Sequence, residues 1–201
     1  ASYIVNDMID LPNDRVHFKK KNRPIASSAI SIPSALLICM TILSASLMIA
    51  SSIDTQFVWI LALYLLASLL YSTILKKIPI VDIVSLSLLF TYRVITGFIV
   101  CELPLSIWLV GFSIFTFLGL ATIKRITELY NQVQLGHQTS INTRGYQAKD
   151  NVYLTSLMIS SFQVSIIIFL LYLNSNVIPI YYSQVYFLWG IAIIFLLWFT
   201  R

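Results

Sequence analysis

Three aspartates near the start of the chain, Asp7, Asp10 and Asp14, are spaced i, i+3 and i+7. On an α-helix, which turns about 100° per residue, this spacing places all three carboxylates on one narrow face. Carboxylates crowded in this way repel one another unless a cation lies among them. Oxygen ligands suit Mg²⁺, which commonly joins a few carboxylates to substrate phosphates. We therefore expect Asp7, Asp10 and Asp14 to be catalytic ligands of a Mg²⁺ cofactor.

A basic run follows the aspartates directly. It consists of Arg15, Lys19, Lys20, Lys21 and Arg23. Cationic side chains form short, charge-assisted hydrogen bonds with phosphate oxygens. Arg15, Lys20 and Arg23 are thus expected to bind a phosphorylated substrate beside the metal. The spacing of these acidic and basic residues also fits a solvated juxtamembrane loop whose basic side chains contact anionic lipid. The spacing alone leaves both the substrate site and this loop open.

A second charged segment opens with Lys124, Arg125 and Glu128. Lys124 and Glu128 are at i, i+4, and Arg125 and Glu128 are at i, i+3, so both bases can reach the same acid on a helix. Lysine and arginine cannot ligate Mg²⁺, but they can contact phosphate, so we expect Lys124 and Arg125 to act in catalysis and Glu128 beside them at the substrate. The alternative is an ordinary basic helix end at a membrane surface.

Two other arginines are candidate substrate contacts. Arg93 lies inside an apolar stretch, where an ionised side chain is costly, so it should line a polar cavity or pair with an acid on another helix. Arg144 precedes Gly145, which permits a tight turn from which the guanidinium can point at phosphate. For Arg144 the alternative is a plain surface loop.

The rest of the chain is strongly apolar, with 58% hydrophobic and 10% charged residues and a mean hydropathy of +0.86. A bilayer core needs roughly 20 apolar residues per helix. Six runs approach or reach that length: residues 30–50, 56–75, 80–100, 103–123, 152–173 and 184–200. The chain is therefore predicted to be one all-α, polytopic transmembrane helix bundle over residues 1–201. In such a protein the net charge of +5 reports orientation, and we expect no nucleic-acid partner.

Lysine and arginine gather in alternate connections between these runs. They occur before the first run and after the second, fourth and sixth, whereas residues 51–55, 101–102 and 174–183 contain none. Basic loops stay in the cytoplasm, so residues 6–29 and 124–151 are expected to face it and to close over one cavity. Residues 1–5 resemble the tail of a preceding span, and both ends of the chain are interpreted as truncated.

The first segment has a specific pattern: Asn6-Asp7-x-x-Asp10-x-x-x-Asp14-Arg15, then Arg23-Pro24-Ile25-Ala26-Ser27. This pattern resembles the first signature of the UbiA superfamily of intramembrane prenyltransferases. In that superfamily the aspartates hold Mg²⁺ against a diphosphate, which implies this role for Asp7, Asp10 and Asp14 and a substrate contact for Asn6. The resemblance implies nine spans when complete, about six of them present here. The chain departs from the pattern with Phe18, where proline is frequent, and Ser28, where glycine is frequent.

The basic second segment stands where the better-known aromatic prenyltransferases of this superfamily have a second aspartate motif. Together with Tyr71-Ser72-x-x-Leu75-Lys76-x-x-Pro79-x-x-Asp82 and Arg93-x-x-x-Gly97, it resembles the decaprenyl-phosphate phosphoribosyltransferase-like branch. That resemblance implies a multi-pass inner-membrane transferase that moves phosphoribosyl from phosphoribosyl pyrophosphate to polyprenyl phosphate, with Lys76 at the substrate. The alternative is prenyl transfer from a polyprenyl diphosphate to an aromatic acceptor. A non-enzymatic transporter is more remote, because the polar residues concentrate at one membrane face. Expected partners are the polyprenyl lipid, a diphosphate co-substrate and membrane lipids.

Overall fold

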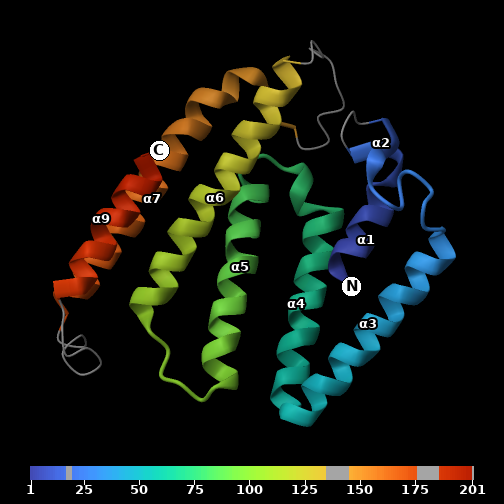
Figure 1. The fold of residues 1–201 in the computed structure, drawn as a ribbon, viewed down its shortest axis with the longest axis horizontal. Coiled ribbons are helices and arrows are strands. Elements are labelled where there is room, and N and C mark those ends of the chain that lie inside the picture. The colour runs from blue at the N-terminus through green and yellow to red at the C-terminus, as the bar shows by residue number, and fades with distance from the viewer. Residues whose placement is uncertain (17–19, 135–144, 176–185, 201) are drawn as a thin grey trace. The chain divides into compact units, whose positions relative to one another are not determined.

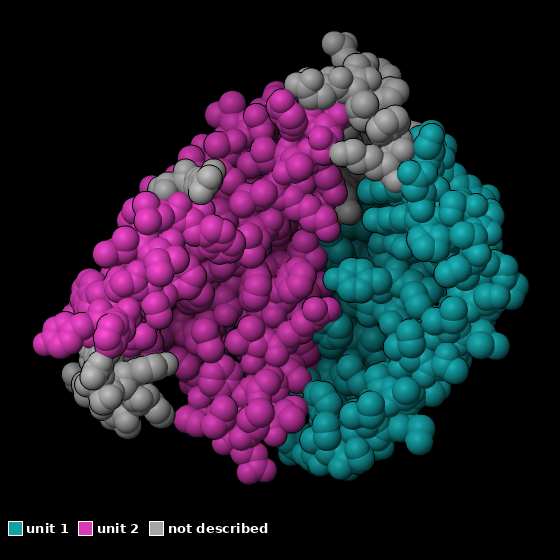
Figure 2. Space-filling view, in the orientation of Figure 1, with its two compact units in different colours: residues 1–78 teal, residues 79–201 magenta. Residues whose placement is uncertain are grey.

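The computed structural model describes residues 1–16, 20–134, 145–175 and 186–200. Every regular element in these ranges is a helix, which confirms the predicted all-α fold (Figure 1). The chain divides into two compact units, residues 1–78 and 79–201, which Figure 2 distinguishes by colour. Each unit is described by itself.

The first unit is built on a pair of long antiparallel helices, α3 (Ile32–Ile53) and α4 (Thr55–Thr73), joined through Asp54 (Figure 1). Ser31 caps α3 by accepting a hydrogen bond from the Ser34 amide at 3.3 Å. A 3₁₀ helix, η2 (Leu75–Lys77), follows α4. The short helix α1 (Ser2–Ile9) contacts both long helices, so its carboxyl end lies close to the segment after α4.

The aspartate segment does not form the single helix that its spacing predicts. Helix α1 ends at Ile9, Asp10 caps it with φ −85° and ψ 0°, and α2 (Leu11–Val16) begins directly afterwards. Pro12 explains the break, because proline has no amide hydrogen to donate to the preceding turn and its ring crowds that turn. Asp7 and Asp14 therefore lie on two successive short helices. The 3₁₀ helix η1 (Lys20–Asn22) leads from them to Arg23.

The second unit contains α5 (Val81–Val100), α6 (Ile107–Gln134), α7 (Asn151–Leu173) and α9 (Tyr186–Thr200), with the 3₁₀ helix η3 (Ala148–Asp150) before α7. Helix α6 packs against both α5 and α7, and α9 packs against α7. The main buried cluster consists of Ile83, Ala121, Leu129, Tyr146 and Leu154. These residues fix the first turns of α5 against the second half of α6.

Five helices in the described residues are long and apolar enough to cross a membrane: Ile32–Ile53, Thr55–Lys77, Val81–Val100, Ile107–Asn131 and Ala148–Leu173. They correspond to the first five predicted spans. Within the described residues the sixth predicted span is represented by the 15 residues of α9, fewer than the roughly 20 of a full crossing. Large apolar side chains such as Trp59 (73% exposed) and Ile107 (82%) point outwards, which suits contact with hydrocarbon.

Ser28 has a left-handed backbone conformation, with φ 64°. Glycine adopts this conformation without the steric cost that a Cβ atom brings. Glycine, which is frequent at the matching position of the resembled signature, would adopt this backbone conformation more readily than Ser28 does.

The α6–α7 contact depends on the absence of a side chain at Gly119. A Cβ atom there would lie 2.5–2.8 Å from three ring atoms of the buried Phe162. We expect Gly119→Ala to lower the free energy of unfolding by about 1–3 kcal/mol, because the ring has to shift in a packed interface. The matched control is Gly111→Ala on the same helix, where the nearest atom of Ile168 would be 3.5 Å away. Equal thermal unfolding of both variants in detergent would refute the close approach.

Candidate functional site

Arg23 joins two of the three aspartates in the first unit. Its Nη1 atom lies 2.7 Å from Asp7 Oδ1 and 2.8 Å from Asp14 Oδ2. The Asp14 side chain is only 4% exposed, whereas Asp7 and Arg23 are 29% and 36% exposed. A single nitrogen atom of a half-exposed guanidinium thus holds one carboxylate from α1 and one from α2.

Lys76 holds the third aspartate. Its Nζ atom lies 2.6 Å from Asp10 Oδ1 and 3.1 Å from Asn6 Oδ1, and the Asn6 amide in turn donates to Asp10 Oδ2 at 3.1 Å. The Lys76 side chain is 6% exposed. This buried ammonium ties the end of α1 to η2, so two basic residues that were predicted to contact substrate also organise the aspartate segment.

The four side chains that the signature assigns to metal and diphosphate therefore form two pairs. Asp7 and Asp14 converge on Arg23, and Asn6 and Asp10 converge on Lys76. Within the described ranges, no three or more carboxylate, histidine or cysteine side chains are grouped to hold one metal ion. The donors still fit Mg²⁺ chemically, because all are oxygens and each pair is directed at a single cationic atom.

Burial raises the pKa of Asp7 above the usual range of an aspartate. The neighbouring Arg23 lowers this pKa, and the nearby Asp14 and Asp10 raise it further, with burial as the largest influence. A proton consequently competes with any cation for the Asp7 carboxylate at a higher pH than at an ordinary aspartate. Metal binding that uses Asp7 should weaken as the pH falls through this raised pKa.

The burial of Lys76 predicts a stability effect. We expect Lys76→Gln to lower the free energy of unfolding by about 1.5–3 kcal/mol, because it removes a charged hydrogen bond to Asp10. Lys77→Gln is the matched control, since Lys77 is exposed in the same 3₁₀ helix, and its effect should stay within about 0.5 kcal/mol. Thermal denaturation in detergent measures both, and indistinguishable midpoints would contradict the role of Lys76.

The second unit contains a buried ionic cluster around Arg125. Its Nη1 donates to Glu128 at 2.6 Å, which confirms the i, i+3 contact expected from the sequence. Its Nε and Nη2 both donate to Asp82 on α5, the latter at 3.2 Å. The side chains of Arg125 and Asp82 are 1% and 0% exposed. Arg125 is thus a buried link between α5 and α6, bound to two carboxylates.

The sequence did not reveal the pairing of Asp82 with Arg125, which are 43 residues apart. One signal was present: an ionisable residue at the edge of a predicted span usually has an ionic partner on another helix. The sequence alone could not identify which basic residue is the partner of Asp82.

The remaining candidates are distributed over several elements. Arg15 on α2 and Lys124 on α6 are exposed, and Lys20 is half-buried in η1. Arg93 is exposed on α5, with its guanidinium carbon 5.3 Å from the centre of the Phe90 ring. Arg144 lies outside the described residues.

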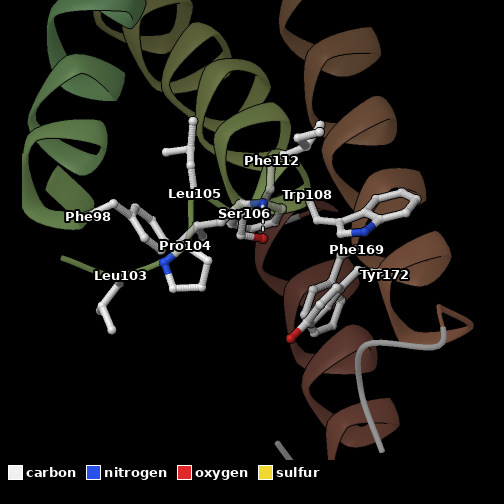
Figure 3. Close-up of a pocket in the computed structure, with 11 residues that line it drawn as sticks. Phe98, Leu103, Pro104, Leu105, Ser106, Trp108, Phe112, Phe169 and Tyr172 are labelled. Atoms are coloured by element: carbon white, nitrogen blue, oxygen red, sulfur yellow. Dashed lines mark hydrogen bonds between the residues drawn. The ribbon is translucent and has the colours of Figure 1, made fainter. Parts of the chain in front are cut away.

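The second unit also has an apolar cavity of about 610 Å³, formed where the α5–α6 connection meets the last turns of α7 (Figure 3). Its lining includes Phe98, Trp108, Phe112, Phe169 and Tyr172 and, among the described residues, contains no carboxylate or basic side chain. Such a lining suits the binding of a hydrocarbon chain and offers no charged group for catalysis. Phe112 lines this cavity, whereas Phe117, on the same helix, packs on Phe90 with ring centres 5.3 Å apart.

Comparison with curated proteins identifies several relatives. The chain is 35% identical over 173 residues to the uncharacterized protein y4nM of Sinorhizobium fredii, which covers 86% of this chain and 33% of that protein. It is 26% identical over 174 residues to nodulation protein NoeC of Azorhizobium caulinodans, covering 87% and 56%. It is 32% identical over 142 residues to decaprenyl-phosphate phosphoribosyltransferase of Mycolicibacterium smegmatis, covering 71% and 43%. The chain therefore spans between a third and just over half of these relatives.

Among solved structures, a UbiA homolog from Archaeoglobus fulgidus, bound to GPP and Mg²⁺, matches 99% of this chain and 68% of its own with a TM-score of 0.71. At 15% sequence identity this match shows a shared fold. The model of the UbiA prenyltransferase family matches residues 1–201. Together with the membrane-length helices, these matches confirm the resemblance seen in the aspartate signature: the chain is part of an integral membrane protein and belongs to the UbiA prenyltransferase family.

Proposed function

We propose that the protein is a Mg²⁺-dependent membrane transferase that moves a phosphoribosyl group from phosphoribosyl pyrophosphate to a polyprenyl phosphate. The observation that carries the proposal is the cluster of Asp7, Asp14 and Arg23 beside Asn6, Asp10 and Lys76. It brings acidic oxygens and cationic groups together, as recognition of a metal–diphosphate requires. The similarity to the decaprenyl-phosphate phosphoribosyltransferase of Mycolicibacterium smegmatis supports this choice of reaction.

The transfer exchanges one carbon–oxygen bond for another. An oxygen of the lipid phosphate attacks the anomeric carbon of the sugar, and the bond from that carbon to diphosphate breaks. The diphosphate leaves with the electron pair. When bound, Mg²⁺ would neutralise this leaving group and thereby lower the barrier.

The chain's own residues have distinct parts in this proposal. The carboxylates of Asp7, Asp10 and Asp14 bind the metal–diphosphate, and Arg15, Lys20 and Arg23 compensate the remaining phosphate charge. Lys124, which is exposed in the second unit, and Arg144 are proposed phosphate contacts. Arg93 and Asn6 are proposed contacts to other parts of the substrates. Arg125 acts as a positioning residue, because Asp82 and Glu128 hold its guanidinium inside the unit.

The pattern of basic connections supports a proposal for the location. We place the protein in the inner membrane, with residues 6–29 and 124–151 facing the cytoplasm, where phosphoribosyl pyrophosphate would be available. Within each unit the charged cluster lies at one end of the long helices. The aspartates and Lys76 lie beyond the carboxyl end of α4, and Asp82 and Arg125 lie near the amino end of α5.

Prenyl transfer is the second candidate. It is favoured by the GPP and Mg²⁺ bound to the Archaeoglobus fulgidus homolog and by the aromatic lining of the apolar cavity. In that reaction the allylic carbon–diphosphate bond breaks, and a carbon of an aromatic acceptor forms the new bond and then loses its proton. The same aspartate cluster would serve the leaving diphosphate.

One pair of assays separates the two candidates. Full-length protein in detergent is given polyprenyl phosphate with phosphoribosyl pyrophosphate labelled in the ribose, and separately polyprenyl diphosphate with aromatic acceptors. We expect label to enter the lipid fraction in the first assay and to depend on Mg²⁺. Product in the second assay alone would reject phosphoribosyl transfer. Contaminating enzymes are excluded if the Asp7→Asn variant, prepared in the same way, is inactive while the Lys77→Gln variant is active.

A further inference from the structure

The two cations that hold the aspartate segment differ in how firmly they are held. Arg23 is 36% exposed and reaches both of its carboxylates through a single nitrogen atom. Lys76 is 6% exposed and bonds to two side chains of the segment. If Arg23 leaves Asp7 and Asp14, water can solvate its guanidinium. If Lys76 leaves Asp10, a buried ammonium loses its main counter-charge, which is far more costly.

The charges around Arg23 are also incompletely balanced. Two carboxylates share one guanidinium, so these three side chains sum to one negative charge, which the positive charge of Lys20 near Asp7 offsets only in part. A divalent cation in the place of the guanidinium would neutralise both carboxylates. Mg²⁺ also prefers carboxylate oxygens, and the Asp7 and Asp14 oxygens are already directed at one point.

We propose that Arg23 is a built-in counter-ion that a divalent metal displaces from Asp7 and Asp14, while Lys76 remains on Asp10. The inference rests on the proposed metal-dependent function and specifies how its site is loaded. Before the metal binds, Arg23 keeps two repelling carboxylates together. After exchange, the released guanidinium lies next to the metal, where the phosphates of the substrate would meet it.

The exchange predicts that removing the positive charge of Arg23 raises the affinity of the protein for a divalent metal. Mn²⁺ is titrated into full-length protein in detergent as a paramagnetic substitute for Mg²⁺, and the free ion is measured by electron paramagnetic resonance. We expect Arg23→Gln to bind Mn²⁺ about 10-fold more tightly than the wild type, because the competing cation is gone. Arg23→Lys keeps the competitor and should stay close to the wild type. The control Lys77→Gln removes an exposed charge outside the cluster and should have no effect.

A measurement on the unaltered protein avoids any doubt about folding of the variants. Phenylglyoxal modifies accessible guanidinium groups, and mass spectrometry locates the modified arginine. We expect Mg²⁺ to accelerate modification of Arg23, since exchange releases it from its carboxylates, and to leave the buried Arg125 unmodified.

The exchange is overturned if a folded Arg23→Gln variant binds Mn²⁺ no more tightly than the wild type. It is also overturned if Mg²⁺ does not accelerate the modification of Arg23 by phenylglyoxal. In either case, saturable Mn²⁺ binding by the wild type would leave the metal-dependent function standing. If neither the wild type nor Arg23→Gln binds Mn²⁺ saturably, both the exchange and the proposed metal-dependent transferase are overturned.

Discussion

Replacing Asp7 with asparagine is expected to lower Mg²⁺-dependent turnover by roughly 100- to 1,000-fold. A metal contact to a leaving group supplies several kcal/mol of transition-state stabilisation, and each 1.36 kcal/mol corresponds to a factor of ten. Asparagine keeps the size of the side chain and can still accept a hydrogen bond from Arg23, so the local fold should survive. The initial rate at saturating Mg²⁺, with whichever substrate pair proves active, measures the effect.

A substitution at Asp7 allows an effect on turnover to be distinguished from an effect on folding. Its side chain is 29% exposed, whereas Asp14 is almost fully buried and Asp10 neutralises the buried Lys76. Substitutions at Asp10 or Asp14 would mix loss of metal binding with loss of folding. A thermal midpoint near that of the wild type verifies that Asp7→Asn is folded. Wild-type turnover in this variant would refute its role at the metal.

Replacing Asp82 with alanine is expected to destabilise the second unit by about 3–5 kcal/mol. The substitution removes one of the two carboxylates bound to the buried guanidinium of Arg125, and breaking a buried ion pair from one side carries this cost. Thermal and denaturant unfolding in detergent should both show the loss. The cause is the uncompensated charge rather than the lost contact.

A double variant tests that explanation. In Asp82→Leu with Arg125→Met, both charges are gone and apolar groups fill the space, so most of the lost stability should return. Glu128, which is 31% exposed, can then be solvated by water. If the double variant is as unstable as Asp82→Ala, the effect arises from packing around Asp82 and not from the charge on Arg125.

The sequence predicted those features that depend on neighbouring residues. Apolar runs of membrane length identified the helices, and the i, i+3 spacing identified the contact of Arg125 with Glu128. The break between α1 and α2 at Asp10 has a local cause in Pro12, although the regular spacing of the aspartates predicted one continuous helix. Helix α6 continues to Gln134, beyond the predicted span, because its polar end contains no proline or glycine to stop it.

The sequence could not predict contacts that depend on how the chain returns on itself. Lys76 lies 66 residues from Asp10, and Asp82 lies 43 residues from Arg125. Several bases could have supplied each partner, and the choice is made by helix packing and by which side chain becomes buried. The division of the aspartates between Arg23 and Lys76 follows from this packing. Instead of one group of three carboxylates, Asp7 and Asp14 share Arg23, and Asp10 binds Lys76.

The long sequence separation between Asp10 and Lys76 also has a consequence for biogenesis. A nascent chain emerges from its amino end, so the aspartate segment leaves the ribosome well before Lys76 is made. Arg23, only nine residues after Asp14, is made long before Lys76 and can hold Asp7 and Asp14 earlier. The ammonium of Lys76 reaches Asp10 only after α3 and α4 have entered the bilayer and come together as a hairpin. The earliest part of the motif to be synthesised is thus completed only when membrane insertion of this hairpin has finished.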